Sequence, residues 1–114
     1  MSSYKLGMMG DPLSSEIFSA LGIDTFEIEN EESDDIKDMR KTLLQWIKSG
    51  EYGAIFITER FAEKLDEILD RFSYSYLPSI ILIPEIKGSK GLAESIVRET
   101  LKRAAGRDIM AEEE

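Results

Sequence analysis

The residues best placed to do chemistry are a few carboxylates and hydroxyls that follow two predicted strands. Asp11 follows the first strand, and Thr58 and Glu59 follow the third. A phosphate-accepting aspartate site on such a sheet needs an acidic cluster after the first strand, an aspartate ending the third and a lysine after the last. Here the first place holds only Asp11, and a divalent cation needs several converging oxygens. We therefore interpret Asp11 and Thr58 as helix N-caps and predict no phosphotransfer.

Two glycine-containing turns could in principle cradle a phosphate group. Residues 7–11 (GMMGD) follow a strand and open a helix, where such loops occur. They lack the third glycine of the dinucleotide fingerprint, and no Gly-Lys-Ser/Thr is present in the chain. Residues 88–91 (GSKG) carry serine and lysine in the opposite order. We interpret these glycines as turn formers and predict no cofactor.

The composition argues against several further kinds of catalysis and binding. The chain of 114 residues has no histidine and no cysteine, so the commonest general base, the commonest metal ligand and any thiolate are absent. Its 23 acidic and 14 basic residues give a net charge of −9, which repels nucleic acid and anionic lipid. We predict no catalytic residues, no metal site and no nucleic-acid partner. Because no apolar run approaches the roughly 20 residues that a bilayer requires, and no leader opens the chain, we expect a cytoplasmic domain without membrane insertion.

Strand-like and helix-like segments alternate along the chain. Strands are predicted at 4–9, 24–29, 52–58 and 80–83, and helices at 12–21, 36–49, 61–72 and 90–105. This alternation predicts an α/β fold, a four-stranded parallel sheet with right-handed crossovers. The most hydrophobic strands are expected at the centre, which gives the order 2-1-3-4 with 24–29 at an edge. We interpret the apolar run 80–83, between two prolines, as a strand buried on both faces. Trp46 and the segment 74–76 (YSY) are interpreted as core and loop packing.

The last helix, from Lys90 or Gly91 to Ala105, has two interpretations. Its apolar stripe comprises Ala93, Ile96, Val97, Leu101, Ala104 and Ala105. The stripe either packs on the domain's own sheet, as amphipathic helices usually do, or docks on a partner helix. Right-handed crossovers leave one sheet face under-covered, so this helix or another protein must supply the missing layer. We divide the chain into a sheet domain (1–86), a C-terminal helical segment (87–110) and an acidic tail (111–114).

With these residues in place, the chain resembles the F subunit of the prokaryotic V-type (A/V-type) rotary ATPases over nearly its full length. The likeness rests on Tyr4-Lys5-Leu6-Gly7, Gly10-Asp11, Ile57-Thr58-Glu59, Leu77-Pro78 through Ile83-Pro84, Gly88-Ser89, Gly106, Asp108 and Ile109. Two departures are Ala20-Leu21-Gly22 in place of the usual Leu-Ala-Gly, and a more acidic loop at 30–35.

The resemblance implies a non-catalytic central-stalk (rotor) component with a receiver-like sheet domain and a C-terminal helical part. Such proteins bind the coiled-coil D subunit, turn with it inside the catalytic A/B hexamer, and couple ATP turnover to ion transport. This places the chain in the cytoplasm, peripheral to the membrane. The hypothesis for the partner-binding residues is Ile96, Val97, Leu101, Ala104, Ala105 and Ile109.

Two other functions remain open from the sequence. One is a receiver-like signalling domain that lacks its phosphoacceptor. The other is a flavodoxin-like small-molecule binder that uses the crevice between Gly10 and Thr58.

Overall fold

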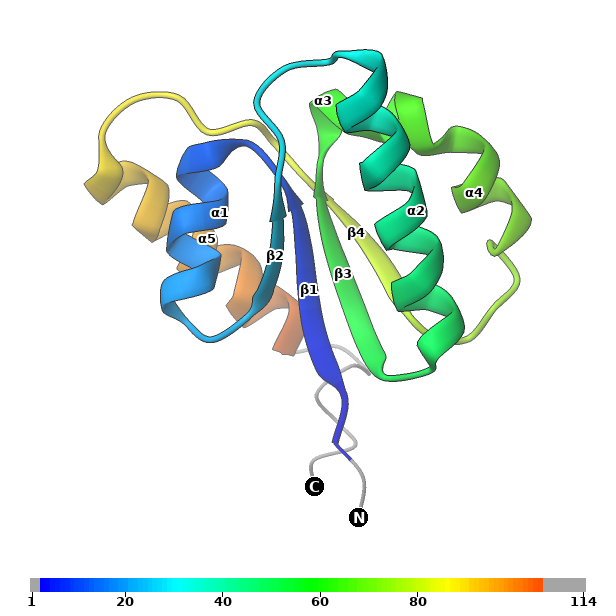
Figure 1. Ribbon diagram of the computed structural model, residues 1–114. Helices are drawn as coiled ribbons and strands as arrows, with labels where there is room; N and C mark the ends of the chain where they lie inside the picture. Colours follow the sequence, from blue (N-terminus) through cyan, green and yellow to red (C-terminus); the bar gives the residue numbers. More distant parts are fainter. Residues whose placement is uncertain (1–2, 106–114) are drawn as a thin grey trace.

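Four parallel strands form one sheet in the order β2-β1-β3-β4 in the computed structural model, which describes residues 3–105 (Figure 1). The strands are β1 (Lys5–Gly10), β2 (Asp24–Glu27), β3 (Tyr52–Thr58) and β4 (Ser79–Ile83). In the register of the sheet, Met8 lies beside Phe56 and Phe56 beside Ile81. The predicted fold class and strand order are confirmed.

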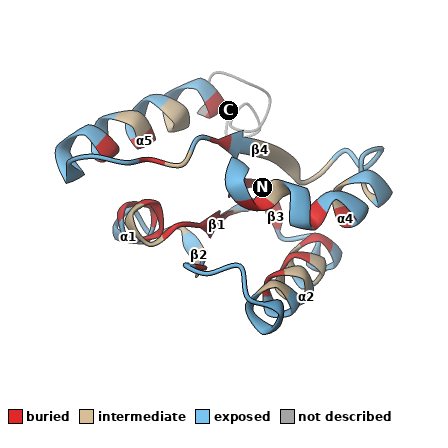
Figure 2. Ribbon diagram, turned by 90° about the horizontal axis from the view of Figure 1, so that it is seen from above, coloured by how far each residue is buried: buried red, intermediate tan, exposed pale blue. Residues whose placement is uncertain are grey.

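Helices cover both faces of this sheet. They are α1 (Pro12–Ala20), α2 (Ser33–Ser49), α3 (Glu59–Ala62), α4 (Asp66–Arg71) and α5 (Lys90–Ala105). Figure 2 looks along the sheet from above and shows α1 and α5 on one side, with α2 and α4 on the other. The domain therefore has three layers, with β1 and β3 at the centre.

The two faces of the sheet carry separate apolar cores. Under α2, α3 and α4 lie Met9, Met39, Leu43, Ile55, Ile57, Phe61, Leu65 and Ile68, all buried. Under α1 and α5 lie Met8, Phe18, Phe56, Ile83, Ala93 and Val97. Phe18 and Phe56 meet with ring centroids 5.3 Å apart. Since α5 contributes Ala93 and Val97 to this second core, it completes with α1 the helical layer on this face of the sheet.

Local signals in the sequence set the ends of α1 and α2. Asp11 caps α1 by accepting a hydrogen bond from the Ser14 N–H at 3.0 Å, and Pro12 follows at the first helical position. Gly22 and Gly50 come just after the two helices with φ of 84° and 72°, a conformation that favours glycine. The first cap and both glycine stops are confirmed.

The helix predicted at 61–72 is broken. In its place α3 ends at Ala62, a 3₁₀ turn η1 covers Glu63–Leu65, and α4 follows. Phe61, Leu65 and Ile68 are all buried, so the predicted apolar face is confirmed. Neither glycine nor proline marks the break, and the prediction of one continuous helix was wrong.

The strand at 80–83 is not buried on both faces, and that prediction was also wrong. The strand β4 lies at an edge of the sheet, beside β3 alone among the strands of residues 3–105. Ile83 is buried, but Ile80 and Ile81 are half-buried and the Leu82 side chain is 49% exposed. Apolar composition alone therefore overestimated the burial of this strand.

Candidate partner-docking surface

Asp11 and Thr58, at the ends of β1 and β3, satisfy their polar groups by hydrogen bonds within the protein. The Thr58 hydroxyl donates to Asp11 Oδ1 at 3.0 Å and accepts from the Asp11 N–H at 3.4 Å, while Asp11 Oδ2 is taken by the cap of α1. Both residues are buried. The predicted N-cap position of Thr58 at the start of α3 is confirmed, but its side chain makes no cap hydrogen bond. Gly10 packs against Thr58 so closely that a Cβ there would collide with the hydroxyl.

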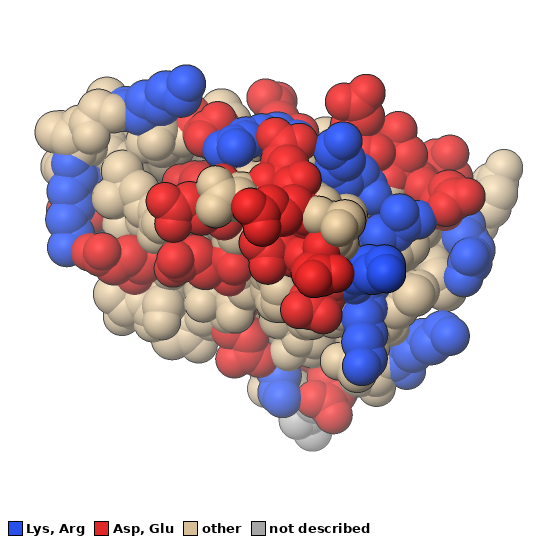
Figure 3. All heavy atoms as spheres, turned by 45° about the horizontal axis from the view of Figure 1, so that its top comes forward, with Lys and Arg blue, Asp and Glu red and all other residues tan. Residues whose placement is uncertain are grey.

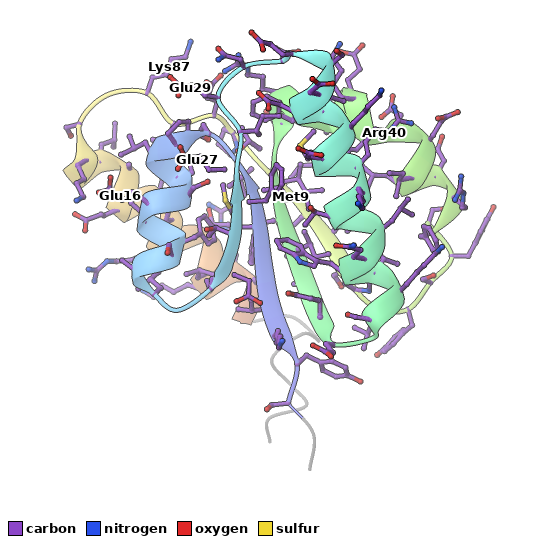
Figure 4. All side chains as sticks on the ribbon, in the orientation of Figure 1. Met9, Glu16, Glu27, Glu29, Arg40 and Lys87 are labelled. Carbon is purple, nitrogen blue, oxygen red and sulfur yellow. The ribbon has the colours of Figure 1, made fainter. Side chains whose placement is uncertain are left out.

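Acidic residues gather at the end of the sheet where the strands finish. Residues 27–35 hold six carboxylates, all exposed, and Figure 3 shows acids crowding this face. In Figure 4, Glu27 and Glu29 lie on the same side of the molecule as Glu16 of α1, apart from Arg40 on α2. Within residues 3–105, no three His, Cys, Asp or Glu side chains are arranged to hold a metal ion. This face is therefore an anionic surface without a metal cluster in the part of the chain that the structure describes.

Arg60 bridges two loops at that end. Its guanidinium lies 3.2 Å from Glu31 in the β2–α2 loop and 3.2 Å from Glu85 after β4. The hydrogen bond with Glu31 is the largest of the effects that raise the pKa of Arg60. These partly exposed pairs join the loop before α5 to the acidic loop, but exposed ion pairs contribute little stability.

The residues predicted to bind a partner occupy different environments on α5. Val97 and Ala104 are buried in the core under α5, whereas Ile96 and Leu101 are half-buried beside it. The side chain of Ala105 and the whole of Ile109 lie outside the described residues. One part of the apolar stripe, with Val97 and Ala104, therefore faces the domain's own sheet, and another, with Ile96 and Leu101, lies at the edge of the contact between helix and sheet.

Apolar packing holds α5 on the sheet, with one ion pair at its start. Lys90 Nζ lies 2.6 Å from Glu16 Oε2 of α1, and both side chains are more than half exposed. The hydrogen bond from Lys90 to Glu16 is the main cause of the raised pKa of Lys90. An exposed pair of this kind adds little, so the buried Ala93 and Val97 do most to keep the helix in place.

The aromatic residues differ from one another in their surroundings. Trp46 stacks on Tyr52 with ring centroids 4.9 Å apart, which confirms its predicted packing role. Tyr74 and Tyr76, in the loop between α4 and β4, are instead 98% and 78% exposed, so the predicted loop packing of this segment was wrong. Leu82 of β4, at the edge of the sheet, is also exposed, so apolar surface is accessible both in this loop and on the strand that follows it. The sequence signal for this surface was the aromatic pair itself.

Comparisons with known proteins agree on one family. A model of the family described as "ATP synthase (F/14-kDa) subunit" matches residues 6–101. The chain is 33% identical over 111 residues to the V-type ATP synthase F subunit of Clostridium perfringens, covering 96% of this chain and 100% of that one. It is 34% identical over 107 residues to the V-type F subunit of Fusobacterium nucleatum, covering 94% and 96%. The A-type ATP synthase F subunit of Thermococcus kodakarensis is 34% identical over 105 residues, covering 92% and 97%.

The fold and these matches define the class of the protein as a component of a rotary ATP synthase built on a parallel α/β sheet. Within that class, the chain belongs to the family of F subunits of the prokaryotic V-type and A-type enzymes. The resemblance inferred from the sequence is thereby confirmed. None of the helices within residues 3–105 has the length and apolar character needed to cross a membrane.

Proposed function

We propose that this chain is the non-catalytic rotor component of a V-type ATP synthase, binding the D subunit in the central stalk and coupling ATP turnover to ion transport. The observation that supports this most is the family match over nearly the full length of the chain and of its relatives. The hydrogen-bonded pair of Asp11 and Thr58 also supports a role without chemistry of its own. In this proposal the chain works on the cytoplasmic side, inside the A/B hexamer, and reaches the membrane only through the complex.

The proposed contact with the D subunit includes α5. Ile96 and Leu101 are reachable while the helix rests on the sheet, because both are half-buried at its margin. Val97 and Ala104 are buried there and join the contact only when α5 is raised. We include Ala105 and Ile109 in the proposed contact, which would then continue towards the C-terminus.

Co-expression with the D subunit of the same organism and gel filtration of the product test this function. The two chains are expected to elute together as a stable complex. If the chain elutes alone, folded and monomeric, the rotor function is contradicted.

A pair of variants tests the part assigned to α5. Leu101→Asp is expected to release the D subunit while the melting transition of the sheet domain is retained. Leu92→Asp is the matched control, since Leu92 is 51% exposed on the same helix and lies outside the proposed contact. If Leu101→Asp instead unfolds the domain, Leu101 belongs to the core and α5 is not a docking helix.

A further inference from the structure

The outer edge of β2 leaves backbone hydrogen-bonding groups open. Among the strands of residues 3–105, β2 pairs with β1 alone, so it forms an edge of the sheet. Just past the strand, the Ile28 N–H donates inward to the Gly10 C=O at 2.8 Å. Because the backbone groups of successive residues in a strand point to opposite edges, those of Thr25 and Glu27 point outward. Their N–H and C=O groups are therefore free to pair with water or with another strand.

A groove lies between α1 and β2, beside this open edge. It has a volume of about 450 Å³ and is bounded by Ser15, Glu16 and Ser19 of α1 and by Thr25 and Glu27 of β2. Thr25 and Glu27 thus belong both to the groove and to the open edge. A strand added beside β2 would place every second side chain on the face of the sheet that carries this groove.

Contacts at its two ends hold β2 in place. At the start of the strand, the Tyr52 hydroxyl donates to Asp24 Oδ2 at 2.8 Å. Just after its end, the Arg60 guanidinium donates to the Glu29 C=O at 3.4 Å. Tyr52 belongs to β3 and Arg60 to α3, so both bonds tie the edge strand to more central elements. An edge held in this way loses little freedom when a partner pairs with it, which favours binding.

The charge beside the groove is negative. Glu27 and Glu29 are exposed, and neither forms an ion pair within residues 3–105, whereas Glu16 is paired with Lys90. Figure 4 shows Glu16 of α1 and Glu27 of β2 on the same side of the molecule. A second copy of this chain, with its net charge of −9, would bring carboxylates to the edge and be repelled. The complementary segment is therefore basic.

We propose that the outer edge of β2 binds an extended basic segment of another subunit of the ATP synthase, which adds to the sheet as a fifth strand. The outward backbone groups of Thr25 and Glu27 pair with the backbone of this segment, and one of its lysine or arginine side chains lies over the groove beside the Glu27 carboxylate. A helix could bring the same charge, but its backbone groups are already paired, so it would leave the edge of β2 open. This surface is separate from the contact proposed for α5.

Hydrogen exchange of backbone amides tests this contact. In the isolated chain, the outward N–H groups of Thr25 and Glu27 are expected to exchange rapidly, whereas that of Phe26, which faces β1, exchanges slowly. In the assembled enzyme, exchange at Thr25 and Glu27 should slow by about tenfold or more, with Phe26 slow in both states. If Thr25 and Glu27 exchange as fast in the assembled enzyme as in the isolated chain, the contact is overturned.

Charge reversal tests the chemistry of the partner. Glu27→Lys is expected to remove most of the protection of the Thr25 N–H in the assembled enzyme, because it sets like charges against each other. Asp38→Lys on α2 is the matched control, since Asp38 is also exposed and the net charge changes equally; protection should be retained. If Glu27→Lys lowers the melting temperature of the isolated chain, Glu29→Lys carries the same test. Full protection after charge reversal at the edge would contradict a basic partner.

A photoreactive group at Ser19 identifies the segment. Ser19 is exposed on α1 and bounds the groove. Irradiation of the assembled enzyme, followed by mass spectrometry, is expected to link this position to a segment of another subunit with two or more lysine or arginine residues at alternate positions. A link to a second copy of this chain or to an acidic segment, or the absence of any link, contradicts the inference.

The inference and the proposed function fail separately. If the chain elutes with the D subunit and enters the enzyme while Thr25 and Glu27 remain unprotected, the β2 contact is overturned and the rotor function stands. If the chain does not enter the enzyme, both are overturned.

Discussion

Thr58 makes a buried polar contact between the ends of two neighbouring strands. Its hydroxyl is a donor to the buried Asp11 carboxylate, so Thr58→Val would leave one carboxylate oxygen without that partner. Loss of a buried partner costs about 1–3 kcal/mol. We expect a decrease of this size in the free energy of unfolding by urea. Thr25→Val on the edge strand β2 is the control and is expected to change little; equal losses in the two variants would contradict a special role for Thr58.

Tyr52 predicts a pH dependence at the alkaline end. Burial, helped by its hydrogen bond to Asp24 at 2.8 Å, raises the pKa of Tyr52. The unfolded chain then loses this proton near pH 10, while the folded chain keeps it to higher pH. The contribution to stability is therefore complete below about pH 10 and is lost as the pH rises beyond it.

Urea unfolding measured between pH 8 and pH 11 checks the direction of this pH dependence of stability. Stability of the unmodified chain is expected to fall across the upper part of the range, and Tyr52→Phe should fall less steeply. Tyr74→Phe, at a fully accessible position, should follow the unmodified chain. If the stability of Tyr52→Phe falls with pH as steeply as that of the unmodified chain, Tyr52 is not the cause of the pH dependence.

At the residue scale, the sequence predicted contacts between near neighbours and missed those between distant ones. The Asp11 cap was predictable because its partner, Ser14, is three positions away. Asp11 and Thr58 are 47 positions apart; the predicted strand order brings both strand ends to one crevice, but the hydrogen bond between the two side chains follows only from the register in the structure. The same limit explains why the sequence indicated the cap position of Thr58 but not its bond to Asp11.

Among the elements, α5 determines whether the domain is complete by itself. Val97 is buried in the core shared with Phe56 and Ala93. Val97→Ala would remove two methyl groups from this core, and we expect a loss of about 1–3 kcal/mol in the free energy of unfolding. Ser95→Ala, on the exposed face of the same helix, should be neutral. If both variants melt alike, α5 does not pack on the sheet in solution.

Periodicity predicted the helices well because it reports which face of an element meets the core. It did not predict the 3₁₀ turn at Glu63–Leu65, since the same side chains are buried with or without the break. It also misjudged β4: the predicted order places this strand at an edge, but an apolar run does not tell how far the neighbouring helices cover the two faces of an edge strand. The exposure of Leu82 is therefore a finding of the structure that composition alone could not predict.

On the scale of the whole molecule, two surfaces of different character lie on one sheet. Carboxylates gather where the strands end, and exposed apolar side chains occur both on β4 and in the loop that precedes it. The family assignment was accessible from the sequence because its matching residues span nearly the whole chain. The packing of α5 was accessible only in part, because the sequence left open whether its apolar stripe faces the sheet or a partner, and the structure buries Ala93 and Val97 against the sheet.

The most direct test of the rotor function is to watch this chain while the assembled enzyme hydrolyses ATP. Because the chain has no cysteine, Lys41→Cys on the exposed face of α2 provides a single labelling site away from β4 and α5. With the A/B hexamer immobilised and the label followed by single-molecule fluorescence polarisation, ATP is expected to drive unidirectional rotation of the labelled chain. A label that remains fixed relative to a hexamer actively hydrolysing ATP would contradict the account.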